Sequence, residues 1–426
     1  MHRIQKDVVY QLTTSAEVVV KKFVARQPIL DRDKTLFAYE LLFRSGVENY
    51  FHSDAPDRAS SSVMVDSFLV LGMQSMTGGR KAFINVTKNV IVNQYATLLP
   101  KELAVVEVLE TVEPDEKVVA ACEILKKKGY LIALDDFVYR TKLEPLIRLA
   151  DFIKVDFQAT SEWIRRHLVQ QYSPRGIRML AEKVETPEQF REATDMGYTY
   201  FQGYFFCKPE ILIGRDIPAF KQNYLWILQE INKEEPDIAQ LEQVLKQETS
   251  LCYKFLRYLN SAAFDFVGEV RSLRHALTLL GINEVRKWVS LVALACMGED
   301  KPKELVVSAV MRAKFCENLA LKSSLKSRAT EFFLMGLFSM LDAILERPLG
   351  EILDEVRISK DVKSALLNGV NLFRYVYELV LAYEKAKWDR ATQFVISLRT
   401  SESMVSQAYL DAISWGHRIF QTGMGA

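Results

Sequence analysis

The sequence predicts two successive domains: an α/β barrel of the TIM-like (β/α)8 type, followed by an all-α helical domain. The chain has 426 residues, which is enough for two or three domains. Through the first half, short segments rich in β-branched and aromatic residues alternate with longer helical segments, as in a largely parallel sheet. After Pro209 the strand pattern ends, and helical periodicity continues almost to the C-terminus.

Eight segments of the first half have the composition of β-strands: Phe23 to Leu30, Leu36 to Phe43, Lys81 to Val86, Leu103 to Leu109, Tyr130 to Phe137, Phe152 to Phe157, Arg178 to Val184 and Tyr200 to Phe206. Helical stretches lie between them, as over residues 59–76, 116–128 and 163–171. Eight strands fit a barrel of about 250 residues or fewer. An open doubly wound sheet is the alternative, but no Gly-x-Gly-x-x-Gly turn follows any of these segments.

Helices are expected in the second half, for example over residues 237–247, 250–260, 273–280, 282–297, 304–323, 330–344 and 360–366. Gly, Pro and Asn mark the turns between them, and a bundle is the simplest arrangement. We expect an N-terminal extension over residues 1–22, the barrel over 23–212, the helical domain over 213–412 and a C-terminal tail over 413–426.

The composition narrows the class of protein. A formal net charge of +1 gives no electrostatic reason to expect nucleic acid or an anionic membrane as the main partner. No apolar run approaches the roughly 20 residues that span a bilayer, and the first 22 residues lack the apolar region of a signal peptide. The five cysteines are widely spaced and form no Cys-x-x-Cys pair, which favours reduced thiols and a cytoplasmic protein.

Polar residues gather where the predicted strands end: they are Glu40, Asn85, Glu107, Glu110, Asp135, Asp136, Lys154, Asp156, Glu182, Glu185 and Gln202. The carboxyl ends of barrel strands meet at one face, where active sites are built. Taken singly, each residue is most simply a solvated charge, a helix cap, a turn residue or a salt-bridge partner. Taken together they favour a site, because charges inside apolar strands are costly unless they are paired or bind metal.

The number of acids predicts metal ions. So many carboxylates cannot share one pocket as bare anions, because like charges repel. Carboxylate and amide oxygens suit Mg²⁺ or Mn²⁺, and two such ions a few ångströms apart can activate a water and hold a phosphodiester. We therefore expect two Mg²⁺ or Mn²⁺ ions at this face of the barrel.

From about Phe23 to Pro209, the chain resembles the EAL family of bacterial cyclic di-GMP phosphodiesterases. The signature tripeptide of that family reads Glu40-Leu41-Leu42 here, and Arg44 stands at the position of the substrate-binding arginine. Gln27-Pro28-Ile29 resembles an early segment of the family. The resemblance implies binding of cyclic di-GMP and its hydrolysis to linear pGpG.

The resemblance also implies a role for each polar residue. The ligands of the first metal would be Glu40, Asn85, Glu107 and Asp135. The second metal would be held by Asp135 and Asp136. The catalytic group would consist of Lys154, which positions or polarises the water, Glu182 as a base or second-site ligand, and Glu110 and Glu185 in support. The substrate-binding residues would be Gln27, Arg44 and Gln202.

Two departures from the family pattern bear on catalysis. Leu41 replaces the signature alanine, which puts a bulkier side chain beside a metal ligand. After the Asp pair, the family has a loop rich in Gly and Ser, whereas residues 137–142 contain no glycine. Weak catalysis and ligand sensing without turnover both remain open, and the retained acids favour catalysis because they are costly in a barrel that binds no metal.

Roughly residues 223–368 resemble the HDOD domain, a relative of HD-type phosphohydrolases without their metal site. The resemblance rests on residues 250–261, 272–277 and 280–281. The position of the His-Asp pair reads Phe338-Ser339-Met340, and this half contains only His275 and His417, too few histidines for a binuclear site. His275 is expected to be a packed or capping residue. The resemblance implies an output domain that binds an unidentified signalling protein.

Two rival functions remain open beside a cyclic di-GMP phosphodiesterase coupled to an HDOD domain. The barrel could be an inactive receptor or a protein-interaction scaffold, or it could be an unrelated hydrolase of another phosphodiester. A homodimer is also compatible with the sequence. Fold class alone does not choose among these functions, because one fold hosts many activities.

Overall fold

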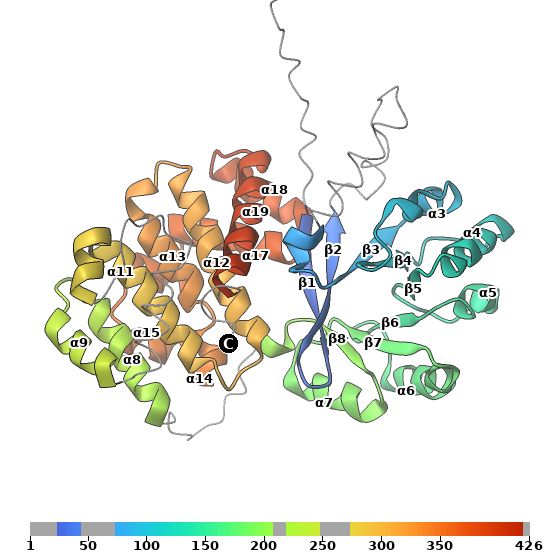
Figure 1. Cartoon of the computed structure of the whole chain (residues 1–426), viewed down its shortest axis with the longest axis horizontal. Coiled ribbons are helices and arrows are strands. Elements are labelled where there is room, and N and C mark those ends of the chain that lie inside the picture. The colour runs from blue at the N-terminus through green and yellow to red at the C-terminus, as the bar shows by residue number, and fades with distance from the viewer. Residues whose placement is uncertain (1–23, 44–72, 208–218, 248–272, 421–426) are drawn as a thin grey trace, which may run out of the picture.

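The computed structural model describes residues 24–43, 73–207, 219–247 and 273–420 (Figure 1). Eight strands close into a barrel in the order of the chain. Their bounds are β1 Val24–Asp31, β2 Leu36–Phe43, β3 Lys81–Val86, β4 Ala104–Val108, β5 Leu131–Leu134, β6 Phe152–Asp156, β7 Arg178–Glu182 and β8 Tyr200–Gln202. All eight predicted strands are therefore confirmed, several of them shorter than expected, and the TIM-like barrel is confirmed with them.

The barrel departs from a strict (β/α)8 repeat at its first two strands. β1 and β2 form an antiparallel hairpin, and β1 also pairs with β8 in antiparallel fashion, whereas β2 to β8 run parallel. The hairpin is possible because the turn is tight: the Asp31 carboxylate accepts hydrogen bonds from the N–H groups of Asp33 (2.9 Å) and Thr35 (2.8 Å). The described turn between β1 and β2 thus contains no helix to cover the outside of these strands.

Five described helices follow the later strands and cover the outside of the barrel (Figure 1). Their bounds are α3 Lys88–Val92, α4 Glu116–Lys127, α5 Glu144–Ile147, α6 Glu162–Tyr172 and α7 Pro187–Met196. Capping residues in the sequence determine where α4 and α7 begin and where α7 ends. Asp115 caps α4 by accepting from the Val118 N–H, and α7 begins with a Thr186 cap and a proline and ends at Gly197 (φ 107°).

The second half is helical, as predicted. Its described helices are α8 Ala219–Ile231, α9 Ile238–Gln247, α11 Leu273–Met297, α12 Lys303–Leu321, α13 Ala329–Phe338, α14 Leu341–Leu345, α15 Leu349–Glu355, α16 Lys360–Leu366, α17 Leu372–Glu384, α18 Trp388–Ser397 and α19 Glu402–Ile419. The helix expected over residues 250–260 lies outside the described residues. No described helix is long and apolar enough to pass through a bilayer.

Two expectations for this half need correction, and one expected helix boundary, at Gly281, is confirmed. The single helix expected over residues 330–344 is two helices, because the chain turns at Ser339 and Met340 between α13 and α14. Gly281 interrupts α11 with a φ of 76°, at the boundary expected between two helices. The expected division at residue 412 falls inside α19, whose Ile413 and Ile419 are buried, so residues 413–419 belong to the helical packing.

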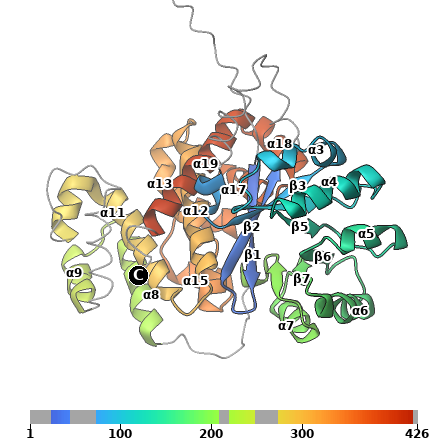
Figure 2. The same cartoon turned by 45° about the vertical axis from the view of Figure 1, so that its right-hand side comes forward.

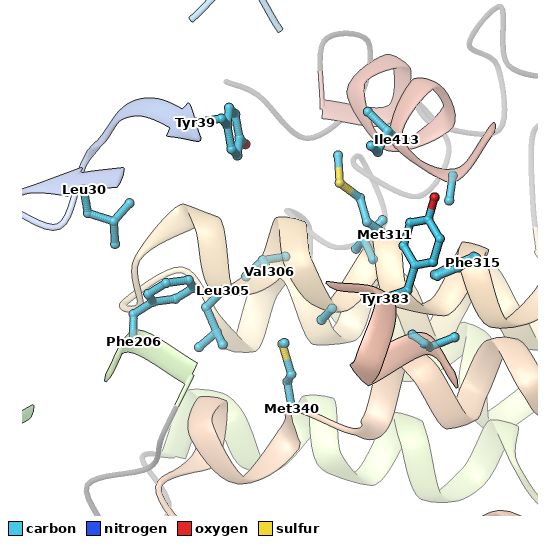
Figure 3. Close-up of a cluster of buried hydrophobic side chains, with 14 of the residues drawn as sticks. Leu30, Tyr39, Phe206, Leu305, Val306, Met311, Phe315, Met340, Tyr383 and Ile413 are labelled. Carbon is cyan, nitrogen blue, oxygen red and sulfur yellow. The ribbon is translucent and has the colours of Figure 1, made fainter. Parts of the chain in front are cut away.

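The second half supplies the cover that the hairpin lacks. Helices α12, α17 and α19 lie against β1 and β2 in both views of the molecule (Figures 1 and 2). Figure 3 shows Leu30 and Tyr39 from the two strands facing Leu305, Val306 and Met311 of α12. All of these side chains are buried, and they belong to one apolar core that continues from the barrel into the helices.

A close crossing of α12 and α13 predicts a sensitive glycine. A Cβ on Gly336 of α13 would lie 2.6 Å from the Ala313 Cα and from the Arg312 carbonyl oxygen of α12. Gly336→Ala should therefore lower the free energy of unfolding by roughly 1–3 kcal/mol, despite the better helix propensity of alanine. Chemical denaturation measures this loss.

Gly350 in α15 is the matched control, since its added Cβ would meet nothing closer than Leu367 Cδ2 at 3.8 Å. Gly350→Ala should leave stability unchanged or raise it by up to about 1 kcal/mol. Equal effects of the two substitutions would contradict the close crossing.

Candidate functional site

The polar residues at the barrel mouth follow from the two-residue period of the strands. A closed apolar layer fills the barrel interior, made of Ile29, Ala38, Phe83, Val105, Ala133, Phe152 and Leu180, with Tyr200 packed against it. Side chains of a strand alternate between faces, so residues two positions further toward the mouth also point inward. Those residues are Gln27, Glu40, Asn85, Glu107, Asp135, Lys154, Glu182 and Gln202. Each predicted site residue in this set is thus stacked directly on the apolar layer.

Lys154 stands at the centre of this polar layer. Its side chain is fully buried, and its Nζ lies 2.8 Å from Glu182 Oε1, 3.0 Å from Asp135 Oδ1 and 3.3 Å from Glu40 Oε2. Its Nζ also pairs with Glu107 Oε1. One ammonium group therefore holds together four carboxylates that come from four different strand ends.

Three amide side chains complete the ring on the side of β1, β3 and β8. Asn85 Nδ2 donates to Glu40 Oε1 at 2.9 Å. Gln202 Nε2 donates to Glu40 Oε2 at 2.6 Å and to Gln27 Oε1 at 2.9 Å. Glu40 consequently accepts hydrogen bonds from two amides and from Lys154, which fixes both of its oxygens.

The acid–base properties of the ring reflect crowding as well as burial. Burial raises the pKa of Glu107 well above its usual range, and the nearby Glu40 raises it further. Burial raises the pKa of Glu182 to about 8. Burial would lower the pKa of Lys154, but the carboxylates around it, Glu107 foremost, raise that pKa well above its ordinary value. The ring thus contains more carboxyl groups than the single ammonium group of Lys154 can neutralise.

Several oxygens of the ring have the surroundings that a cation site requires. Among the described residues, Asn85 Oδ1, Glu107 Oε2, Glu182 Oε2 and Gln202 Oε1 are buried and accept no hydrogen bond. Buried acceptors without a donor are uncommon in proteins. Carboxylate oxygens of Asp135, Asp136 and Glu182 also lie within 4.8 Å of one another, a group that could hold a metal ion. This donor set fits a hard divalent cation.

The turn at Asp135 and Asp136 is fixed by backbone contacts. Asp136 has a left-handed φ of 37°, which aims two consecutive carboxylates toward the mouth. The Phe137 N–H donates to the Lys154 carbonyl at 2.9 Å, and the Phe137 ring is buried against Tyr172 with 5.7 Å between the ring centroids. The loop that lacks glycine is therefore anchored at its start, while Val138 is 63% exposed.

Two of the described site residues, Glu110 and Glu185, stand apart from the ring. Glu110 is exposed in the turn after β4, where it lines the same cavity as Asp135 and Asp136. Glu185 is exposed, and its N–H donates to Gln189 Oε1 at 2.8 Å. Arg44 lies outside the described residues. The roles assigned to these three residues stay predictions.

Leu41 does not crowd the ring. It is buried on the opposite face of β2 from Glu40, in the outer apolar core. A bulkier side chain beside a metal ligand was expected from the sequence, but neighbours along a strand point to opposite faces. Arg26 and Tyr39, which were not among the expected site residues, lie on this outer face too, and the same alternation could have located them.

The helical half has no comparable polar ring in its described residues. No group of His, Cys, Asp and Glu suited to a metal is found there among the described residues. His275 is exposed on α11, so of its two expected roles packing is excluded and capping stays a prediction. His417 of α19 lies next to Arg26 of the barrel. Ser339, at the position of the His-Asp pair, is buried and accepts a hydrogen bond from Arg312 Nη1 at 2.9 Å.

The central lysine predicts a large stability effect. Lys154→Met should lower the free energy of unfolding in the absence of divalent cations by roughly 3–5 kcal/mol, because it leaves buried carboxylates without a counter-charge. Chemical denaturation measures the loss. Lys183→Met is the control, since Lys183 pairs with Asp156 but is 51% exposed, and it should cost about 1 kcal/mol or less. Similar losses in the two variants would contradict the central role of Lys154.

Comparison with known proteins finds two domain families in the chain. The EAL domain matches residues 71–209, which contain β3 to β8, and the HDOD domain matches residues 217–345. Among solved structures, BlrP1 of Klebsiella pneumoniae in a calcium/cy-diGMP complex is 23% identical and has a TM-score of 0.35. That match covers 43% of this chain and 54% of the BlrP1 chain.

Two curated relatives match almost the whole chain. YuxH of Bacillus subtilis (strain 168), an uncharacterized protein, is 34% identical over 94% of this chain and 99% of its own length. CdgJ of Vibrio cholerae serotype O1 is described as a cyclic di-GMP phosphodiesterase and is 35% identical over 93% of each protein. Because these matches run through both halves, the chain belongs to the family of proteins that join an EAL domain to an HDOD domain.

Proposed function

We propose that the chain is a cyclic di-GMP signalling protein whose barrel hydrolyses cyclic di-GMP to linear pGpG. The observation that carries the proposal is the ring of carboxylates and amides around Lys154 at the barrel mouth. CdgJ, named as a cyclic di-GMP phosphodiesterase, supports the choice of substrate. In the reaction, a water oxygen bonds to one phosphorus, and the bond from that phosphorus to the ribose 3′-oxygen breaks, with a proton passing to the leaving oxygen.

Two Mg²⁺ or Mn²⁺ ions fit the donor set of the ring. We assign the first ion to Glu40, Asn85, Glu107 and Asp135. The second ion is assigned to Asp135 and Asp136, with Glu182 close enough to join them. Such a pair of ions, when bound, activates a water and neutralises charge on the phosphodiester.

Other side chains at the site position the metal ligands, accept a proton or bind the substrate. Lys154 holds the carboxylates of four strand ends in one arrangement, and its ammonium group can orient the attacking water. Glu182 Oε2 is buried and accepts no hydrogen bond, so it is an open acceptor for a proton of that water. Gln27 and Gln202 lie at the side of the ring, where their amides can bind the dinucleotide. Arg44, which is not among the described residues, is assigned the same role. Glu110 and Glu185 are assigned supporting roles.

A receptor without turnover is the second candidate, and one observation favours it. The loop after Asp136 contains no glycine, and its Val138 and Tyr139 are 63% and 47% exposed, so these two side chains project into solvent. In either case we assign the helical half to an unidentified signalling partner. The buried free thiols of Cys122, Cys296 and Cys316 support placement in the reducing cytoplasm.

Hydrolysis tests the proposal directly. The purified full chain with Mn²⁺ should convert cyclic di-GMP to pGpG, as followed by chromatography. Glu40→Gln should lower kcat by about 100-fold or more, because a ligand matters at least as much as the groups around it. Glu113→Gln is the control, since Glu113 is exposed in the turn after β4 and belongs to no part of the ring.

The other outcomes are equally informative. Tight binding of cyclic di-GMP by the wild-type chain without pGpG would establish the receptor. Neither binding nor product would overturn both candidates and leave the scaffold.

Metal binding gives a measurement that does not need turnover. Mn²⁺ at about 100 times its Kd should raise the free energy of unfolding by about 2.7 kcal/mol for each site it fills. Asp136→Asn should reduce this gain, whereas Asp33→Asn, in the exposed hairpin turn, should leave it unchanged. A gain of the same size in Asp136→Asn would contradict the second metal site.

A further inference from the structure

One edge of the barrel is completed by the helical half. β8 pairs with β1 only at residues 29–31, so the described strands leave the first residues of β1 with a strand neighbour on the β2 side alone. The Arg26 N–H in this stretch donates to the Tyr409 hydroxyl of α19 at 3.3 Å. Helix α19 therefore takes the place of a strand partner at this edge.

The hairpin has two faces that carry different chemistry. Gln27 and Glu40 are paired across the hairpin and point into the ring. Arg26 and Tyr39, their neighbours along the chain, point outward, and the Arg26 guanidinium lies 4.1 Å from the centre of the Tyr39 ring. Each ring residue of the hairpin is thus one peptide bond away from an outward-facing residue.

The outward pair is bound to helices of the second half. The Tyr39 hydroxyl donates to both carboxylate oxygens of Glu304 in α12, at 3.0 and 3.2 Å. The Arg26 guanidinium lies 2.9 Å from His417 Nε2 of α19 and 2.8 Å from Met311 Sδ of α12. Figure 3 shows Tyr39 facing Met311 across this contact.

Because the contacts of Tyr39 and Arg26 with α12 and α19 are buried, the strands and the helices should move together. Tyr39, Glu304 and Arg26 are 2%, 5% and 7% exposed. A buried polar group that loses its partner costs free energy, so a shift of α12 or α19 should carry Tyr39 and Arg26 with it. Because Gln27 and Glu40 share the backbone of the same two strands, such a shift also moves the ring, and catalytic sites tolerate displacements of only about 0.5 Å.

We propose that α12 and α19 position Gln27 and Glu40 through Arg26 and Tyr39, so that the helical half forms one wall of the barrel site and regulates it. Glu304 is a positioning residue in this arrangement. A partner that moves α12 or α19 would change the affinity of the ring for its ligands, and ligand binding at the ring would change the helices in return. The part that concerns cyclic di-GMP rests on the proposed function.

The test compares two buried glutamates of the same helix. Glu304 contacts the hairpin, whereas Glu317, 3% exposed, pairs with Lys287 and Lys314 inside the helical half. Glu304→Leu in the full chain should raise hydrogen exchange of the backbone amides of residues 24–43 by roughly fivefold to tenfold without any ligand. Glu317→Leu should leave those amides within about twofold of the wild type.

A conservative variant and a binding measurement separate positioning from simple destabilisation. Glu304→Gln keeps an oxygen that can accept from the Tyr39 hydroxyl, so it should restore exchange to near the wild-type rate. The Kd for Mn²⁺ should rise about fivefold to tenfold in Glu304→Leu alone. If Glu304→Leu does not fold, Tyr39→Phe takes its place, because it keeps the ring beneath Arg26 and removes only the hydroxyl.

The inference is overturned if the Glu304 and Glu317 variants raise exchange over residues 24–43 equally, or if neither raises it. A wild-type chain that neither binds nor hydrolyses cyclic di-GMP would end the proposed function instead. The exchange result would then still decide whether the helices hold the hairpin.

Discussion

A single buried ammonium group surrounded by carboxylates is the constraint on which the barrel mouth depends. Lys154 makes ion pairs with Glu40, Glu107, Asp135 and Glu182, and these residues come from strands that are far apart in the sequence. Charges in such a place are tolerated only when each has a partner, so the strand ends must bring their side chains within hydrogen-bonding distance of Lys154. One positive charge does not balance four acids, and the excess makes the mouth a receptor for further cations.

The same requirement explains why the first two strands need the helical half. Most strands of the barrel are held by a helix that returns along its outer surface, but β1 and β2 are joined by a tight turn. Among the described residues, α12 and α19 pack against their outer face, and this contact helps to hold Gln27 and Glu40 in a fixed position. Fusion of the two domains therefore has a structural consequence within the barrel, beyond the joining of two functions in one chain.

The sequence predicted the parts that depend on local pattern. Strand composition located all eight strands, and the polar residues at their ends identified seven members of the ring, because period-two alternation is a local property. The eighth, Gln27, came from the family resemblance alone. The antiparallel hairpin was not predicted, although residues 31–35 between the two expected strands are too few for the crossover that parallel strands need. The contacts of Tyr39 with Glu304 were beyond reach for another reason: the two residues are 265 positions apart, and no local pattern relates them.

The position of Leu41 on the outer face of β2 changes how its replacement of the family's signature alanine is interpreted. A large residue after Glu40 looked like an obstacle to metal binding, yet Leu41 faces the outer apolar core and is 1% exposed. The position therefore accommodates a large side chain within the packing outside the barrel. The substitution belongs to that outer face of the hairpin, and it leaves the chemistry of the inner face to Glu40.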